Sequence, residues 1–241
     1  MNKKALVIGG GGTLGRSFVS SLIKRDFEVS STYFKNKNPQ CSNFYLNLDS
    51  DSNSIVSSLN KIQEEFSTPD LLIIASGTAF YNPLPASSQD DINHTLKVDL
   101  LGPIEIVKFF LPFFLKRNTG TIHIVSAIAG VLPAVKNMSI YTSAKFGLVG
   151  FVRSLAWELL GTSVKISVSC PGGIKSDLPN NALGDRESLV KFFESFAKNF
   201  DDADTISEAI LDKLHSREII LFPTDSAKKL FEQNLQKPFW A

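Results

Sequence analysis

The sequence has few cysteines, few histidines and no long apolar run. Its two cysteines, Cys41 and Cys170, lie in apolar, strand-like contexts, which indicates reduced intracellular thiols; the alternative is a single bridge between them. The three histidines are scattered without metal-ligand spacing, so we expect no metal site. His123 lies within an apolar run and is interpreted as a hydrogen-bonded core residue.

The sequence also lacks a membrane segment. No stretch approaches the roughly 20 uninterrupted apolar residues of a membrane span. The nearest candidate, "IEIVKFFLPFFLKR" at 104–117, is interrupted by Lys108 and Pro112. The N-terminal run "ALVI" is too short for a signal peptide and is followed by glycines without a cleavage site. A net charge of +1 gives no bulk attraction to nucleic acid or anionic membranes. We therefore expect a cytoplasmic protein.

Short apolar runs alternate with longer helical patterns along the whole chain. With 241 residues, 43% of them hydrophobic, the chain can bury one large core in a single domain, residues 1–241. The runs lack polar alternation, which is typical of parallel strands covered on both faces. We predict an α/β fold with a doubly wound parallel sheet. Strands are expected at 4–9, 27–33, 43–48, 70–76, 120–126, 164–170 and 218–223, helices near 13–25, 52–66, 88–117, 139–161, 186–200 and 204–215, and a loop at 171–185.

The glycine-rich stretch "GGGGTLG" follows the first strand and begins the first helix. Gly9, Gly12 and Gly15 have the spacing G-x-x-G-x-x-G. Glycines at these positions let the backbone approach a pyrophosphate closely and leave helix N-terminal amides free to bind its charge. The stretch predicts a dinucleotide-binding loop, and a plain strand–helix turn is the alternative.

The end of the second strand bears on which dinucleotide is bound. An acidic residue there selects the ribose 2′-hydroxyl of NAD, whereas a basic residue accommodates the 2′-phosphate of NADP. The segment "SSTYFKNKN" has no acid; it carries Tyr33, Lys35 and Lys37, and Arg16 follows the glycine loop. This pattern favours NADP(H), the alternative being that the lysines belong to an ordinary solvated turn.

"YTSAK" places Tyr141 and Lys145 four residues apart, on one face of a helix. A tyrosine is a poor acid or base near neutral pH, but a neighbouring ammonium favours the tyrosinate. The pair is therefore a candidate for moving a proton to or from a carbonyl oxygen during hydride transfer.

These motifs together resemble those of the short-chain dehydrogenases and reductases, from the first strand to about Leu178. Three further segments match the family in addition to the glycine loop and "YTSAK". The end of "DLLIIASG" corresponds to the family's Asn-Asn-Ala-Gly stretch, and "GTIHIVSAIAG" resembles the strand and turn that carry the catalytic serine. "VSCPGGIKSD" resembles the family's Pro-Gly loop beside the nicotinamide. The resemblance implies a Rossmann-like sheet of about seven parallel strands. It implies cofactor contacts from Gly9, Gly12, Thr13, Leu14, Gly15, Tyr33, Lys35, Asn47, Leu48, Ala75, Ser76, Gly77, Tyr141, Lys145, Pro171, Gly172, Ile174 and Ser176.

The chain departs from the family pattern at two catalytic positions. The position of the family's serine is occupied by Ala127, and the nearest hydroxyl is one residue earlier, on Ser126. Adjacent side chains of a strand face opposite ways, so Ser126 takes the role only if a bulge re-aims it. The family's asparagine aligns with Asp99, which accepts hydrogen bonds, does not donate when ionised, and holds Lys145 more firmly protonated.

Two main interpretations follow. In the first, the chain is an NADP(H)-dependent oxidoreductase that reduces a ketone or oxidises a secondary alcohol, with Tyr141 as acid/base, Lys145 as its partner and Ser126 as substrate orienter. In the second, the fold binds the cofactor but acts as a catalytically impaired, cofactor-gated binding or assembly subunit. A third candidate, a 3-oxoacyl-[acyl-carrier-protein] reductase, is not favoured by the C-terminal segment, which lacks the Gly-Gly-ending strand of those enzymes.

The substrate side and the oligomeric state are expected from apolar patterns. The resemblance implies a mobile substrate lid at about 176–203. Within it, the phenylalanines of "SLVKFFESFAKNF" form a helical stripe that is either core packing or the wall of an apolar or acyl-type substrate pocket. Two helices, at 104–117 and 146–160, are apolar over wide arcs. We expect a homodimer or homotetramer formed through them, with a monomer as the alternative.

Overall fold

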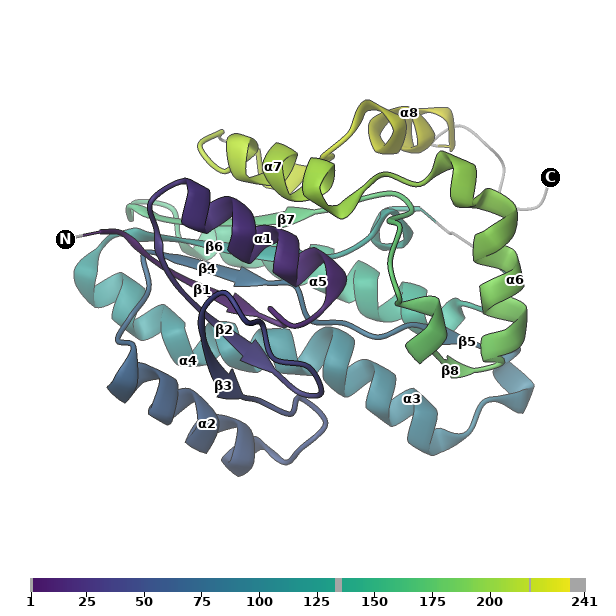
Figure 1. The fold of residues 1–241 in the computed structure, drawn as a ribbon, viewed down its shortest axis with the longest axis horizontal. Helices are drawn as coiled ribbons and strands as arrows, with labels where there is room; N and C mark the ends of the chain where they lie inside the picture. Colours follow the sequence, from purple (N-terminus) through teal and green to yellow (C-terminus); the bar gives the residue numbers. More distant parts are fainter. Residues whose placement is uncertain (1, 133–135, 217, 235–241) are drawn as a thin grey trace.

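The structure is a computed structural model that describes residues 2–132, 136–216 and 218–234. Its centre is a parallel sheet of seven strands in the order β3-β2-β1-β4-β6-β7-β9 (Figure 1). The sheet is built from β1 (Lys4–Ile8), β2 (Glu28–Tyr33), β3 (Ser42–Tyr45), β4 (Leu71–Ile74), β6 (Gly120–Val125), β7 (Val164–Ser169) and β9 (Ile220–Leu221). The single-domain α/β fold and all seven predicted strands are confirmed.

Helices cover both faces of this sheet (Figure 1). In β1, Ala5 and Val7 pack in one hydrophobic cluster while Leu6 and Ile8 pack in the other, which accounts for the run of apolar residues without alternation. One face is covered by α1 (Thr13–Lys24) and α7 (Ala203–Lys213), the other by α2 (Ser52–Glu65), α4 (Gly102–Arg117) and α5 (Ser139–Glu158).

The strand order reverses at β1. From β1 the chain first proceeds to β2 and β3, then returns to form β4 on the other side of β1. In open parallel sheets this switch point leaves a crevice beyond the carboxyl ends of the strands, and ligands bind there. The glycine loop, which follows β1, lies at this edge.

Three features differ from the prediction. The helix expected at 88–117 is divided into α3 (Gln89–Leu96), a π-helical turn (Lys97–Leu101) and α4. The loop expected at 171–185 contains a short strand, β8 (Leu183–Gly184), which pairs in parallel with β5 (Phe80–Tyr81). The helices α6 (Arg186–Phe196) and α8 (Asp225–Asn234) complete the chain, and α8 was not predicted. No helix in the described ranges combines the length and apolar character that crossing a membrane requires.

Candidate cofactor-binding and catalytic site

A cavity of about 780 Å³ lies at the carboxyl edge of the sheet. The glycine loop, the ends of β2 and β4, the first turns of α5 and the loop after β7 all contribute to its wall. Every residue expected to contact the cofactor lines it, and so does Ser126. Segments that are far apart in the sequence therefore meet at the position that the sheet topology favours for a ligand.

The consecutive glycines form a tightly packed cradle. Gly9 has a φ of 82°, and a Cβ on it would lie 2.8 Å from the backbone nitrogen of Ser76. A Cβ at Gly15 would collide with the Gly9 carbonyl oxygen, and one at Gly11 with the Asn36 carbonyl oxygen. The loop is therefore no flexible turn: these glycines let three backbone segments approach one another at the start of α1.

The N-terminal end of α1 is suited to an anion. Gly12 caps the helix without a side-chain hydrogen bond, and the first turn contains no acidic residue. Free backbone N–H groups and the positive end of the helix dipole thus face the glycine loop, as in a pyrophosphate site.

The segment after β2 is held against the glycine loop. The amide of Asn38, almost fully buried, donates to the Gly10 carbonyl at 3.0 Å, and the Thr32 hydroxyl accepts from Gly9 N at 3.0 Å. Tyr33 and Lys35 line the cavity, whereas the Lys37 ammonium lies 5.1 Å from the centre of the Tyr33 ring. Of the two lysines considered for a 2′-phosphate, Lys35 is the one that lines the cavity.

Tyr141 and Lys145 are brought together by α5. The Lys145 ammonium lies 5.4 Å from the centre of the Tyr141 ring. The ring packs in a small hydrophobic cluster with Phe80, Ala129 and Met138. Burial raises the pKa of the Tyr141 phenol, and the negative charge of Asp99 raises it further. The phenol is thus held in its acid form by its surroundings.

Asp99 lies behind the cavity wall, in the π-helical turn. Its Oδ1 accepts a hydrogen bond from Thr78 N at 2.8 Å and lies 3.5 Å from the Lys145 ammonium. Burial raises the pKa of this carboxyl, against the opposing influence of Lys145 and the Thr78 N–H. Sequence alignment pointed to Asp99, but Thr78 was missed because nothing in its local sequence indicates a role.

Ser126 and Ala127 have the alternating orientation of an extended strand. The Ser126 hydroxyl is buried and donates to the backbone carbonyl of Lys145 at 3.0 Å. Ser126 N continues the pairing of β6 with β7 by donating to the Ser169 carbonyl, and Ala127 has extended dihedral angles (φ −157°, ψ 166°). No bulge re-aims Ser126 here, and its hydroxyl binds the backbone of α5; Ala127, the next residue, also lines the cavity.

The segment at 176–203, which is expected to form the lid, is hydrogen-bonded to the chain that follows β4. Leu183 N donates to the Ala79 carbonyl at 2.9 Å and Asp185 N to the Tyr81 carbonyl at 2.7 Å. Leu183 also lines the cavity, as do the lid residues Ser176, Asp177, Leu178, Asn181 and Phe193.

The aromatic stripe of α6 is not core packing, because the buried residue of this helix is Leu189. Phe193 lines the cavity, Phe192 stacks on Tyr81 with ring centres 6.4 Å apart, and Phe196 is exposed.

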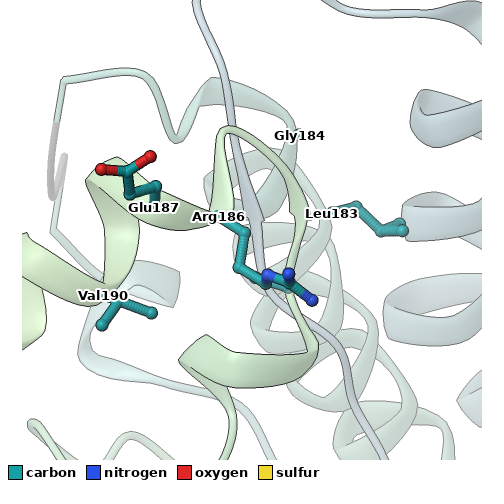
Figure 2. Close-up of a pocket in the computed structure, with 6 residues that line it drawn as sticks. Leu183, Gly184, Arg186, Glu187 and Val190 are labelled. Carbon is teal, nitrogen blue, oxygen red and sulfur yellow. The ribbon is translucent and has the colours of Figure 1, made fainter.

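A second hollow lies at the turn from β8 into α6, with Arg186 and Glu187 in its wall (Figure 2). The site is assigned to the larger cavity because the glycine loop, Tyr141 and Lys145 line that one.

Two of the three histidines have hydrogen-bond or ion-pair partners, and the third, His215, is exposed. His123 is fully buried between the hydroxyls of Ser167 and Ser169, at 2.9 and 3.0 Å, and burial lowers its pKa to about 3; its interpretation as a core residue is confirmed. His94 lines the cavity and pairs with Asp49 at 2.9 Å, a position that its isolated place in the sequence did not indicate.

Comparisons with known proteins agree with this geometry. A family model described as short chain dehydrogenase matches residues 3–187. The chain is 27% identical over 216 residues to the 3-oxoacyl-[acyl-carrier-protein] reductase FabG of Escherichia coli (strain K12), covering 86% of this chain and 88% of that protein.

Two solved structures share the fold. A short chain dehydrogenase/reductase from Burkholderia phymatum in complex with NAD has a TM-score of 0.85 at 16% identity, covering 96% of this chain and 92% of that one. ElxO with NADP bound has a TM-score of 0.77 at 20% identity, covering 95% and 100%. The family match extends from the first strand of the sheet to the start of α6, well over half of the sequence, and the chain therefore belongs to the short-chain dehydrogenase family.

Proposed function

We propose that this protein is an NADP(H)-dependent oxidoreductase that reduces a ketone or oxidises a secondary alcohol. The observation that carries the proposal is that Tyr141 and Lys145 line the same cavity as the glycine cradle. A proton-transfer pair and an anion-binding helix terminus are the two components that such a reaction requires from the protein.

The residues present fit a nicotinamide dinucleotide. The glycines let three backbone segments meet closely at the start of α1, whose free N–H groups suit a pyrophosphate, and the buried Ser76 hydroxyl in the cavity wall lacks a hydrogen-bond partner among the described residues. Lys35 in the cavity wall, with no acidic residue between Ser30 and Asn38, supports NADP(H) over NAD(H). When bound, the nicotinamide supplies or accepts the hydride.

Tyr141 donates its phenolic proton to the carbonyl oxygen during reduction and accepts the hydroxyl proton during oxidation. Lys145 stabilises the phenolate form through its positive charge. Ser126 acts as a positioning residue: its hydrogen bond to the Lys145 carbonyl fixes the turn of α5 that carries the ammonium. Orientation of the substrate carbonyl is thus left to Tyr141, since Ala127 has no donor to offer.

The substrate is proposed to be apolar or acyl-like. Leu183, Phe193 and Ala127 give the substrate side of the cavity an apolar wall. Residues 176–203 are proposed as the lid over this wall. The similarity to a 3-oxoacyl-[acyl-carrier-protein] reductase supports a carrier-bound acyl substrate as the second candidate.

The test combines cofactor binding with turnover. NADPH fluorescence titration of the wild-type chain and of Tyr141→Phe is expected to give similar affinities. NADPH oxidation across a panel of apolar ketones is expected to fall by about 100-fold or more in the variant, the range of positioned acid–base catalysis. Tyr45→Phe, which alters an exposed tyrosine outside the cavity wall, is the control and is expected to match the wild type.

The outcomes separate the two interpretations. Binding of NADPH without turnover of any ketone or alcohol would support the impaired, cofactor-gated binding subunit instead. A clear preference for NADH over NADPH in the titration would overturn the cofactor assignment and leave the reaction class intact.

A further inference from the structure

The buried carboxyl group of Asp99 has one oxygen engaged and one free. Oδ1 accepts from Thr78 N and faces the Lys145 ammonium at 3.5 Å, whereas Oδ2 is without a hydrogen-bond partner among the described residues. Gly77 makes this arrangement possible, because a Cβ there would lie 3.1 Å from Asp99 Oδ1 and 3.3 Å from Lys145 Nζ.

The Asp99–Lys145 pair is almost completely removed from solvent. Asp99 is 0% and Lys145 4% exposed. Within the described part of the chain, Asp99 is the carboxyl group within ion-pair distance of the Lys145 ammonium. A buried ammonium without a counter-charge is strongly disfavoured, and Asp99 is the counter-charge that the fold places beside Lys145, against the desolvation that raises the pKa of the carboxyl.

The consequence for Tyr141 is electrostatic. A lysine ammonium beside a phenol favours the phenolate, and this is the effect on which the proposed reaction depends. The Asp99 carboxylate lies 3.5 Å from the Lys145 ammonium, and the Tyr141 ring centre lies 5.4 Å from that ammonium. At the ring the two opposite charges act as a dipole, so the carboxylate cancels most of the electric field of the ammonium. An uncharged amide of the same shape would leave the positive charge of Lys145 uncompensated.

We propose that the Asp99 carboxylate is a positioning residue that neutralises Lys145 beside Tyr141 and so moves the working range of the reaction to more alkaline pH. This inference rests on the proposed function. At neutral pH Tyr141 is then held in the phenol form, which carries the proton that carbonyl reduction needs, and little of the phenolate that alcohol oxidation requires is present.

Other charged groups surround the same cavity, and all of them are present in both the wild-type chain and the Asp99 variants. His94 of α3 lines it and is paired with Asp49. Arg16, Lys35 and Asp177 line it from the glycine loop, the end of β2 and the loop after β7. Burial and the negative charge of Asp99 both raise the pKa of the Tyr141 phenol.

The experiment compares the wild-type chain with Asp99→Asn, which removes the charge and keeps the shape. The pH dependence of kcat for alcohol oxidation requires the phenolate, so its acidic limb is expected to move to lower pH by about one unit or more in the variant. Asp212→Asn removes a surface carboxylate that pairs with Arg25 and is expected to leave the limb unchanged.

A second measurement reads the phenol without any turnover. Tyrosine labelled at the phenolic carbon gives four resonances, and the one missing in Tyr141→Phe belongs to Tyr141. In Asp99→Asn this resonance is expected to titrate at lower pH than in the wild type. Circular dichroism checks that Asp99→Asn is folded. If Asp99→Asn does not fold, Asp99→Ser is used as a second variant that removes the negative charge.

The two proposals fail separately. A shifted Tyr141 titration without oxidation of any alcohol would retain the inference and overturn the proposed function. If Asp99→Asn changes neither the kinetic limb nor the Tyr141 resonance, Asp99 carries no charge beside the phenol and the inference is wrong.

Discussion

Ser126 and Ala127 lie side by side at the end of β6, and their side chains point in opposite directions. Because β6 keeps its extended pairing through Ser126, the Ser126 hydroxyl faces α5 and Ala127 presents its methyl group to the cavity. Alternation in a strand already made this orientation the expected one at the sequence level, and the hydrogen bond to the Lys145 carbonyl gives the physical reason why the hydroxyl stays there.

This arrangement predicts a gain of function from Ala127→Ser. A hydroxyl at residue 127 adds a hydrogen-bond donor for the substrate carbonyl, and removing one such donor from an oxyanion-binding site costs about 100- to 1,000-fold in kcat. We expect kcat/KM for ketone reduction to rise by about tenfold, with NADPH affinity unchanged.

Ala86→Ser adds a hydroxyl at an exposed alanine and serves as the control, with no rise expected. Ser126→Ala is expected to lower activity and thermal stability together, because it removes the side-chain hydrogen bond that joins the end of β6 to the Lys145 carbonyl. An unchanged kcat/KM in Ala127→Ser would show that residue 127 does not face the reacting carbonyl.

The strands β1, β4, β6 and β7 of the central sheet were predictable because they are apolar runs buried on both faces, and β9 because its two residues lie within a longer apolar run. The pair β5 and β8 was not, since two-residue strands have no periodicity to detect and form only where two loops meet in space. The π-helical turn at Asp99 was also not predicted. The apolar pattern continues through this turn, and its change in helical hydrogen bonding depends on tertiary packing, which the local sequence does not show.

The small sheet of β5 and β8 predicts a specific role for one backbone N–H. Leu183→Pro removes the donor to the Ala79 carbonyl and is expected to release the lid segment from the loop after β4. We expect faster amide hydrogen exchange in residues 183–196 and a KM for ketone raised several-fold, while NADPH binding is retained.

Leu183→Ala is the matched control. It keeps the N–H and removes the apolar side chain, so the exchange rates are expected to stay near the wild-type values while contact with the substrate is lost. Equal exchange rates in Leu183→Pro and the wild type would mean that the stacking of Phe192 on Tyr81, rather than β5–β8 pairing, fastens the lid.

At the scale of the whole molecule, the sequence predicted residues that line one cavity but not the residues that support them. The glycine loop and the Tyr141–Lys145 pair carry their spacing in the sequence. Thr78, His94 and the partner of His94, Asp49, enter the site only because the sheet order places β4, α3 and the loop after β3 around one crevice. Such contacts depend on the tertiary fold and leave no local signal.

The outer surface of α5 predicts self-association of the molecule. Phe146 and Trp157 lie three helical turns apart on one face of this helix, 42% and 73% exposed, and Leu160 just beyond its end is 68% exposed. An apolar face of this kind on the surface of a monomer is unfavourable, and a second copy of the chain would bury it. We therefore expect a homodimer or homotetramer in which α5 packs against a partner.

Trp157→Glu is expected to convert that assembly into monomers, because a carboxylate at the centre of the interface would be buried without a partner. Sedimentation velocity measures the change, and NADPH fluorescence checks that each chain still binds its cofactor. Leu84→Glu places the same charge at another exposed leucine, in the turn before α3, and is expected to leave the assembly intact. A wild-type chain that sediments as a monomer at micromolar concentration would contradict the interface. In that case the aromatic face of α5 would be an exposed surface of the folded monomer, and Trp157→Glu would improve its solubility without changing its mass.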